Sequence, residues 1–443
     1  MSNNQPDFLS AWRLSKKTLF LADFHVHSRF SRATSRDMGP AAMACAARQK
    51  GLKVIGTGDF THPGYLKELK DQLFEESPGL YALKEDPDGA RFILTAEVSN
   101  IFTQGGKNRR VHTVIFAPGF DIAEDIQARL SSIGNIESDG RPIFGFSVKD
   151  LVKIALSASP DCLILPAHVW TPWFSVFGAK SGFDSMEECF EEQSPNIYCL
   201  ETGLSSDPPM NWRLSALDKY TLLSNSDAHS PAKLGRESNL FSCPLTYKDM
   251  VAAIKDPARG FLGTVEFFPE EGKYHLDGHR ACGVRLTPSE SRALGGICPV
   301  CGGSLTLGVL YRVDALADRQ ECTVPPRARP CVHLIPLEEI IAESFGTKTI
   351  TGRVRKEYRR LIQSGRTEMD ILLWMDEEEL RSFAPERIFQ GIMKMRMGEV
   401  RISPGYDGEY GKISLFPGKD DDTGGQNEDA SAPGCKCVQK TLF

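Results

Sequence analysis

The chain has 443 residues, of which 41% are hydrophobic and 25% are charged, with a formal net charge of −6 and a pI near 5.9. This composition excludes collagen-like and fully disordered proteins, and at roughly 150 residues per domain the length predicts two or three domains. No apolar run approaches the roughly 18 residues of a membrane helix, and the acidic balance argues against a passive nucleic-acid-coating protein. The segment Met1–Asp7 lacks the pattern of a secretory signal. We therefore expect a cytoplasmic protein whose 12 cysteines are thiols or metal ligands.

Short β-branched runs alternate with helix-like stretches over about the first 265 residues. This rhythm predicts a β/α barrel or an open parallel sheet. Helices are expected at 40–50 and 147–157. Strands are expected at 18–24, 53–57, 91–96, 111–116, 162–166, 197–200 and 220–224.

The rhythm stops near Gly272, where a segment rich in Gly, Pro, Cys and His begins. A partly basic, helix-like region follows, and then a Gly/Asp-rich stretch of the kind that stays disordered. The sequence therefore predicts an α/β barrel domain (1–270), a small module with short strands at most (271–332), a mainly helical domain (333–416) and a disordered tail (417–443).

Nearly every predicted strand ends in a residue type that binds metals. Side chains at the carboxyl ends of barrel strands converge on one mouth, and two histidines at i and i+2 on an extended segment share one face. Six of the nine histidines of the chain lie at these strand boundaries. The full set is His25, His27, Asp59, His62, Glu97, His112, His168, Asp227 and His229.

Imidazole and carboxylate ligands together suit Zn²⁺, Mn²⁺ or Fe, and Mg²⁺ is a further candidate. Nine such ligands exceed what one ion needs, so we expect a cluster of two or three ions. Such a cluster activates water and holds a phosphoryl oxygen, which indicates phosphoester hydrolysis. The alternative is that these polar residues only support the structure of the strand ends.

The order His-x-His, Asp, His, Glu, His, His, Asp-x-His resembles that of the PHP (polymerase and histidinol phosphatase) metallo-phosphoesterases, over roughly residues 18–265. The resemblance implies a distorted seven-stranded β/α barrel with a trinuclear metal site. Carried over residue by residue, it implies that all nine side chains are metal ligands and form the catalytic centre. The ligand set is complete, unlike that of PHP domains that have lost activity.

A second group of metal-ligand residues lies in the small module. His279 and Cys282 are followed, after 15 residues, by Cys298 and Cys301. Paired ligands with this spacing predict one tetrahedral structural Zn²⁺, which a segment with so little apolar content needs in order to fold. The fourth ligand stays open, because His279 has three nearby substitutes, His275, Cys322 and Cys331.

A PHP-like barrel followed by a zinc module and a basic helical module is similar to the endonuclease Q family, over about residues 18–416. The segments that carry this similarity are FHVHSRFSRATS (24–35), GTGDFTHP (56–63), ETGLSSDP (201–208), YHLDGHRAC (274–282), GICPVCG (296–302) and PGYDGEYG (404–411). The resemblance implies a DNA repair endonuclease that cuts on the 5′ side of deoxyuridine, hypoxanthine, xanthine or an abasic site. Its products would carry a 3′-hydroxyl and a 5′-phosphate.

Two other functions are weighed against the endonuclease. A small-molecule PHP-type phosphatase accounts for the barrel but gives no role to the zinc module, the helical domain or the tail. A non-catalytic DNA-damage adaptor conflicts with the complete ligand set.

In the endonuclease hypothesis, a metal-bound hydroxide attacks the phosphorus 5′ to the lesion, and the damaged base leaves the helix. Candidate base-pocket residues lie in the aromatic loop 170–177 and in 201–212, where packing in the core is the alternative. Basic side chains near the mouth suit contact with the DNA backbone, although solvated loop charges are the alternative. These are Arg29, Arg32, Lys107, Arg109 and Arg110, with Arg36 and the helix 353–360 as further candidates.

The chain ends in Gln439-Lys-Thr-Leu442-Phe443. This end resembles the short peptide that docks into bacterial sliding clamps. In such a contact, Leu442 and Phe443 fill an apolar pocket while Gln439 hydrogen-bonds at its rim. The sequence therefore predicts a sliding clamp as a partner, beside damaged DNA, and no membrane.

Overall fold

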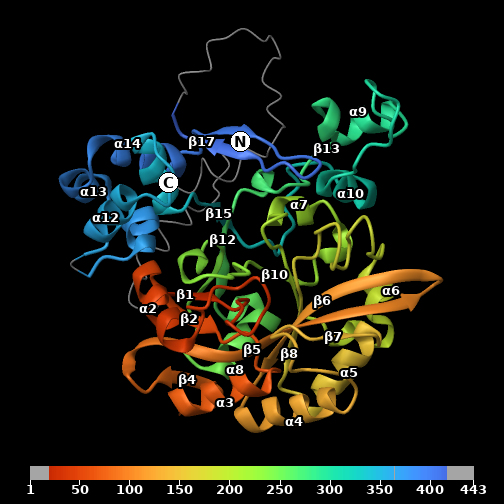
Figure 1. Ribbon diagram of the computed structural model, residues 1–443, viewed down its shortest axis with the longest axis vertical. Helices are drawn as coiled ribbons and strands as arrows, with labels where there is room; N and C mark the ends of the chain where they lie inside the picture. The colour runs from red at the N-terminus through yellow and green to blue at the C-terminus, as the bar shows by residue number, and fades with distance from the viewer. Residues whose placement is uncertain (1–18, 364, 417–443) are drawn as a thin grey trace.

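The computed structural model describes residues 19–363 and 365–416, so the predicted tail and its clamp-binding end lie outside the described residues. A strand-rich barrel fills the lower half of Figure 1, with a helical unit and a small module above it on opposite sides. None of the described helices is long and apolar enough to span a membrane.

Seven strands form the barrel, one for each predicted range. They are β1 (Phe20–Asp23), β2 (Leu52–Gly56), β5 (Asp86–Gln104), β6 (Lys107–Ala117), β8 (Leu163–Pro166), β9 (Cys199–Glu201) and β10 (Thr221–Leu223). β1, β2 and β5 are parallel neighbours, and β9 and β10 form a separate parallel pair. An isolated bridge between Val26 and Ala228 joins the segments that follow β1 and β10. The predicted α/β fold with a distorted barrel is confirmed.

The expectation of a parallel arrangement is wrong at β6. β6 pairs antiparallel with β5 from Leu94–Ala117 to Gln104–Lys107, and antiparallel with β8 on its other side. Only Gly105 and Gly106 connect β5 to β6, and both have positive φ. Two residues in this conformation close a hairpin, whereas a parallel connection needs a crossover of a dozen residues or more.

Additional strands, which the periodicity did not reveal, extend the sheet on both sides of the barrel. The sheet order is β15-β12-β11-β1-β2-β5-β4-β3, and β7 pairs with β5. The added strands are β3 (Leu73–Ser77), β4 (Leu80–Leu83), β7 (Ile143–Phe144), β11 (Ser238–Phe241), β12 (Phe261–Glu266) and β15 (Cys331–His333). β15 comes from the end of the small module, so that module returns to the barrel and adds a parallel strand to β12.

Helices connect the barrel strands and cover their outer surface (Figure 1). The longer ones are α2 (Pro40–Lys50), α3 (Pro63–Gln72), α4 (Phe120–Ser131), α5 (Val148–Ala158) and α8 (Tyr247–Lys255). α2 has the predicted bounds because a proline starts it and Gly51, at φ 92°, ends it in the left-handed conformation. Short helices α6 (Met186–Phe190) and α7 (Pro208–Trp212) lie in the loops between β8 and β10.

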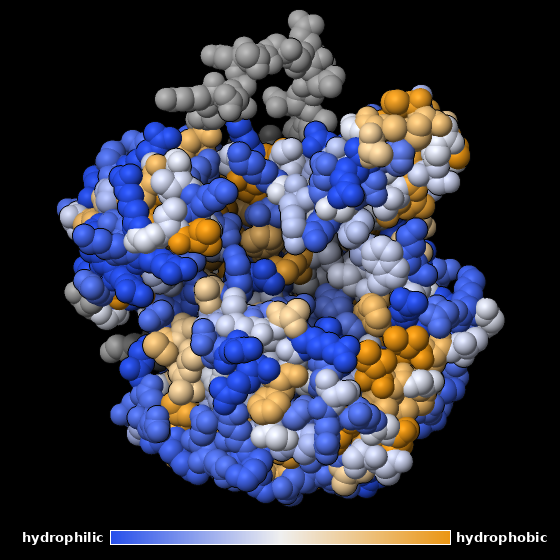
Figure 2. Space-filling model, viewed as in Figure 1, coloured by the Kyte–Doolittle hydropathy of each residue, from blue (hydrophilic) through white to orange (hydrophobic). Residues whose placement is uncertain are grey.

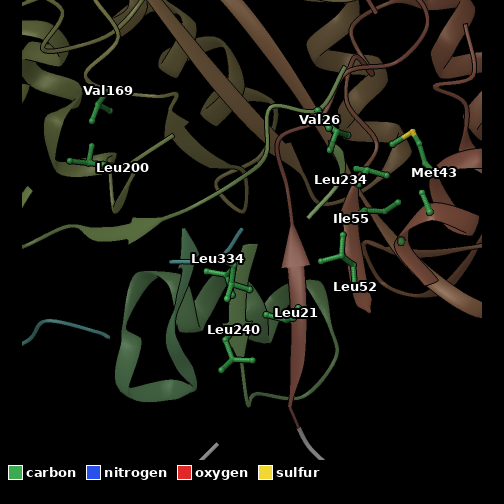
Figure 3. Packing of buried hydrophobic residues seen from close by; sticks show 14 of the residues in the cluster. Leu21, Val26, Met43, Leu52, Ile55, Val169, Leu200, Leu234, Leu240 and Leu334 are labelled. Atoms are coloured by element: carbon green, nitrogen blue, oxygen red, sulfur yellow. The ribbon is translucent and has the colours of Figure 1, made fainter. Parts of the chain in front are cut away.

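The core is continuous from the barrel into the helical unit. Figure 3 shows Leu21 of β1 near Leu240 of β11 and Leu334, which follows β15. The same cluster includes Leu337 and Ile340 of the helical unit. Since burying one such side chain stabilises a fold by about 2 kcal/mol, the two parts stabilise each other.

The helical unit comprises α11 (Leu337–Phe345), α12 (Gly352–Leu361), the π-helix η7 (Asp370–Trp374), α13 (Glu377–Phe383) and α14 (Glu386–Arg396). Arg396 is buried and donates hydrogen bonds to the carbonyl oxygens of Ile371, Leu372 and Met375. These contacts satisfy carbonyls at the end of η7 and connect it to α14.

The small module contains β13 (Asp277–His279), β14 (Val284–Leu286), α9 (Pro288–Ala293) and α10 (Val309–Leu316). The hairpin of β16 (Arg401–Ser403) and β17 (Lys412–Ser414) frames the segment 404–411, which we had placed in the helical domain. This segment contacts the small module instead. Tyr406 bridges to Leu276, and the Asp407 carboxylate accepts a hydrogen bond from the Arg280 backbone at 2.6 Å.

A buried ion pair connects the barrel to the helical unit. Lys50, the last residue of α2, donates to Glu368 at 2.6 Å, and both side chains are less than 10% exposed. Glu368 also accepts from the Tyr358 hydroxyl and the Leu337 backbone. Removing one member leaves a buried charge without its counter-ion, which is costlier than losing an exposed pair.

We expect Lys50→Ala to lower the free energy of unfolding by about 3 kcal/mol, measured by urea denaturation. Lys67→Ala is the matched control, because Lys67 forms an exposed pair with Asp71 and should change stability by less than about 1 kcal/mol. Equal effects of the two substitutions would show that the buried pair does not stabilise the junction.

Candidate metal centre

Glu97 lies at the middle of the polar mouth of the barrel. It is 1% exposed, and its two carboxylate oxygens face different histidines. Oε1 lies 2.7 Å from His112 Nδ1 and 3.3 Å from His168 Nε2. Oε2 lies 3.5 Å from His25 Nε2 and 3.2 Å from His27 Nε2. One carboxylate thus lies among four imidazole nitrogens, in a group of residue types that can hold a metal ion.

His25 and His27 follow β1 and are buried, and each is oriented through its Nδ1 atom by an acidic side chain. Glu201, the last residue of β9, lies 3.0 and 3.1 Å from the Nδ1 of His25 through its two oxygens. Asp59 lies 3.3 Å from the Nδ1 of His27. A partner at Nδ1 fixes the ring and leaves Nε2 for a metal.

Asp227 and His229 complete the side of the centre formed by the segment after β10. Asp227 Oδ1 lies 3.0 Å from His27 Nε2 and 3.7 Å from His25 Nε2. His229 forms a potential ligand group with His27 and Asp227. Its Nδ1 is 2.9 Å from the backbone oxygen of Asp227, which again leaves Nε2 available.

Backbone strain marks this mouth. Asp59, His168 and Asp227 have φ values of 49°, 30° and 47°, although none is glycine. Strained conformations of this kind cluster at functional sites, where the surrounding structure holds them in place. At Gly203, a Cβ atom would lie 2.6 Å from that of His168, so the close approach requires glycine there.

Seven of the nine predicted ligands meet in three overlapping groups. The groups are His25 with His27 and Glu97, His27 with Asp227 and His229, and Glu97 with His112 and His168. Asp59 and His62 belong to none of the groups among the described residues. The Asp59 carboxylate accepts from Ser28 and Ser31, while His62 Nε2 faces the Glu137 carbonyl at 3.0 Å. Metal ligation by all nine residues stays a prediction.

Burial and close charges shift the pKa values across the centre. Burial lowers the pKa of His25, but the charges of Glu201 and Glu97 outweigh it and hold this pKa well above its ordinary value. At His112 the effect of burial outweighs the opposing charge of Glu97 and lowers the pKa to about 4. Burial raises the pKa of Glu97, yet His112 and Arg141 together hold it well below its usual range. The carboxylate is therefore charged and available to a cation.

The orphaned atoms at this mouth fit metal ions. His25 Nε2, His27 Nε2 and Asp227 Oδ1 are buried, and none makes a hydrogen bond among the described residues. Asp227 Oδ1 lies 3.0 Å from His27 Nε2 and 3.7 Å from His25 Nε2, and ligands about 2 Å from one ion have separations near these. Unsatisfied buried polar groups are costly, and a bound cation satisfies all three.

Arg141 is a charged neighbour that the sequence analysis missed. Its guanidinium donates to Glu97 Oε2 at 3.0 Å, and its side chain is 28% exposed. It lies on the loop between α4 and β7, outside the seven predicted strands, so periodicity gave no signal for it. Glu201 was expected only within the candidate base-pocket range 201–212, and its contact with His25 was missed, although it ends β9.

A cavity of about 370 Å³ opens beside the metal centre. His112, His168 and Asp227 line one side of it. Trp173 and Tyr274 line another, with ring centroids 5.6 Å apart in an edge-to-face contact. Trp173 belongs to the predicted aromatic loop, whereas Trp170 of the same loop is buried in the core. The cavity therefore lies between the barrel and the small module.

The four predicted zinc ligands meet at the small module. His279, Cys282, Cys298 and Cys301 place one ligand atom each within 4.8 Å of one another, and Cys301 Sγ is 3.4 Å from His279 Nδ1. None of the three substitutes belongs to this group. Cys322 is exposed, Cys331 is in β15, and His275 lines the cavity at the metal centre.

The small module keeps apolar side chains on its surface. Leu294, Ile297 and Val300 are 39%, 43% and 68% exposed. Figure 2 shows this apolar surface at the tip of the module, at the upper right. The module buries little apolar area of its own, so metal ligation is the main interaction available to hold it together.

The predicted DNA-contact side chains differ in their surroundings. Arg32 is 75% exposed and lies 3.4 Å from Asp139, and Arg29 pairs with Glu68. Lys107 and Arg110 lie on the β5–β6 hairpin, and Arg110 sits over the ring of Phe174 at 5.6 Å. Arg109 is only 8% exposed, donates to the Gly182 carbonyl and stacks on Phe183. Because these contacts use its guanidinium inside the protein, we no longer expect Arg109 to bind DNA.

This arrangement has close counterparts among known proteins. The chain aligns with the lesion-specific endonuclease PfuEndoQ of Pyrococcus furiosus at a TM-score of 0.80, with 31% identity over 91% of this chain and 98% of that one. The chain belongs to the endonuclease Q family. An endonuclease Q in complex with a 27-mer duplex, with an abasic lesion at the active site, aligns at a TM-score of 0.79 with 31% identity. That match covers 92% of this chain and all of the other.

Three further matches come from comparisons of the sequence. Bacillus subtilis YqxK is 29% identical over 88% of this chain and 98% of its own length. Methanocaldococcus jannaschii MJ0043 is 34% identical over 57% of this chain. The aligned region covers 32% of the length of MJ0043. The family model for the MJ0043 C-terminal domain matches residues 336–399, which contain the helical unit.

We expect Cys298→Ala to lose one equivalent of zinc per chain, measured by mass spectrometry of the metals after dialysis against a weak chelator. The reason is that Cys298 is one of four converging ligand atoms, and three protein ligands hold a structural zinc far less well. Cys322→Ala is the matched control and should keep its zinc. Zinc loss from the Cys322 variant would instead make Cys322 the fourth ligand.

Proposed function

We propose that the protein is a metal-dependent DNA repair endonuclease that hydrolyses the phosphodiester on the 5′ side of a deaminated or missing base. Deoxyuridine, hypoxanthine, xanthine and abasic sites are the substrates, and the products carry a 3′-hydroxyl and a 5′-phosphate. One observation carries the proposal. A His/carboxylate centre opens onto a nucleoside-sized cavity, in a chain 31% identical to a lesion-specific endonuclease over nearly its whole length.

The nine strand-end residues are proposed as the metal-ligand and catalytic set, holding two or three ions of Zn²⁺, Mn²⁺ or Mg²⁺. Bound ions supply a hydroxide at neutral pH and stabilise the charge of the phosphate under attack. The ion pair of Arg141 with Glu97 holds a positive group at the mouth of the cavity, where a phosphate oxygen can accept from it. Glu201 keeps His25 in its ligating orientation.

The cavity of about 370 Å³ is proposed as the pocket for the flipped nucleotide. Its volume falls in the range of roughly 300–1,000 Å³ that small-molecule sites occupy. Trp173 is 38% exposed and offers an aromatic face for stacking, while Tyr274 closes the side toward the zinc module. A mispaired or missing base costs least to extrude, which favours lesions over intact pairs.

The test uses a 5′-labelled duplex with one deoxyuridine, incubated with the protein and Mg²⁺, Mn²⁺ or Zn²⁺ and resolved on a sequencing gel. We expect a nick immediately 5′ to the uracil. Asp227→Ala should lower the rate by roughly a thousandfold or more, because Asp227 belongs to the ligand groups. Trp173→Ala should weaken substrate binding about tenfold through lost stacking.

Glu187→Gln is the matched control, because Glu187 is an exposed acid paired with Lys219 and lies outside the metal-ligand groups. It should nick at the wild-type rate. The proposal fails if no metal supports a nick at uracil. It also fails if the protein hydrolyses a chromogenic phosphomonoester far faster than it cuts DNA, which would identify a small-molecule phosphatase.

A sliding clamp is proposed as a partner through Gln439, Leu442 and Phe443, which lie outside the described residues. The support is the sequence of the chain end, in which two apolar residues follow a glutamine at the spacing of clamp-binding peptides. Deleting 439–443 should abolish capture by an immobilised clamp in a surface binding assay and leave nicking unchanged. Equal capture of the full-length and shortened chains would refute this partner.

A further inference from the structure

A second cavity, of about 50 Å³, shares no lining residue with the cavity at the metal centre. It is bordered by β10, by the end of α8, and by the segment 325–330, which contains a turn and is named here the strap. The strap is held in place where the Pro330 carbonyl accepts from the Thr264 backbone at 3.1 Å. The volume is enough for roughly four water-sized atoms, which is the size of a tetrahedral oxyanion.

The charges that line this cavity are mainly positive. Lys219, Lys255, Arg327 and Arg329 line it, with Asp218 as the single carboxylate. Asp218 is already neutralised, because it accepts two hydrogen bonds from Arg319 at 2.6 and 2.7 Å. Lys219 likewise pairs with Glu187. The other three cations have no carboxylate partner within 4 Å in the part of the chain that the structure describes.

Two donors at this cavity have no hydrogen-bond acceptor. Tyr220 is only 7% exposed, and its hydroxyl makes no hydrogen bond to any described residue. Nε of Arg329 is also buried without a partner. Lys255 reaches only the face of the Tyr198 ring, 4.8 Å from its centroid. Leaving a buried hydrogen-bond donor without an acceptor costs free energy of folding. Several such donors around one cavity therefore indicate a ligand that accepts hydrogen bonds.

We propose that this cavity binds a phosphate-type oxyanion. Arg329 and Arg327 supply guanidinium donors, Lys255 supplies a point charge, and the Tyr220 hydroxyl supplies a neutral donor. A guanidinium matches two oxygens of a phosphate at once, and such charge-assisted bonds are about twice as strong as neutral ones. The phosphate belongs either to a DNA backbone or to a free phosphate or nucleotide, and both sources present the same chemistry.

The position of this site separates it from the catalytic centre. β10 begins at the cavity with Thr221, and Asp227 of the metal centre lies six residues further along the chain. The cavity at the strap and the cavity at the metal centre share no lining residue, so the side chains of the metal centre do not hold a phosphate at the second site.

The first experiment measures binding of inorganic phosphate to the full chain by isothermal titration calorimetry at constant ionic strength. Because the metal centre is a second potential phosphate site, the titration is done in the wild type and in Asp227→Ala. We expect a component that Asp227→Ala retains. Arg329→Gln should weaken this component about tenfold or more, and Tyr220→Phe should weaken it by less.

Arg259→Gln is the matched control, because Arg259 is an exposed arginine beside α8 that does not line the cavity. It should leave phosphate binding unchanged. Thermal unfolding of each variant shows that it is folded before it is titrated.

The second experiment identifies the source of the phosphate. It measures the affinity for a short undamaged duplex as a function of salt concentration. If the DNA backbone occupies the cavity, Arg329→Gln lowers the slope of log K against log salt by about one. If a free phosphate or nucleotide occupies it, that slope is unchanged while phosphate binding is lost.

The proposal is overturned if Arg329→Gln changes neither phosphate binding nor the salt slope. Neither experiment depends on DNA cleavage. The oxyanion site and the proposed endonuclease activity can therefore fail independently of each other.

Discussion

Burying the Glu97 carboxylate at the mouth of the barrel carries a large desolvation cost. A carboxylate that is 1% exposed is stable only if cations or donors surround it. Here five groups do so: four imidazoles and the guanidinium of Arg141. The segments that follow β1 and β8 must meet the middle of β5 and β6 at one point for this to happen. The geometry of the barrel and the charge balance of the site therefore depend on each other.

The outer ring of carboxylates follows from the same constraint. Glu201 and Asp59 each face the Nδ1 atom of a central histidine, and Asp59 is itself satisfied by Ser28 and Ser31. A carboxylate thus orients each central histidine, and Asp59 in turn accepts hydrogen bonds from the two serines. The exceptions are the atoms that face the centre, which are left without hydrogen bonds. Because the atoms that face the centre are the ones left without hydrogen bonds, the centre is preorganised to bind cations.

The small module and the helical unit depend on the barrel in different ways. The helical unit shares an apolar core with it and is joined to it by the Lys50–Glu368 pair. The small module has four converging metal ligands and an apolar tip, and it returns to the barrel sheet through β15. Tyr274 brings this module to the edge of the catalytic cavity. The barrel and the small module therefore both border the cavity at the metal centre, while the helical unit packs against the barrel.

The sequence alone determined the strand-end ligands, the zinc spacing and the seven barrel strands, because these are local patterns of residue type and period. It also predicted the bounds of α2 from its terminal proline and glycine. Only the tertiary structure decided which ligands meet, that β6 runs antiparallel, and that Arg109 is used inside the protein. Arg141, Glu201 and the cationic cavity at the strap were also visible only there. Their roles come from contacts between segments far apart in the chain, and no local pattern encodes such contacts.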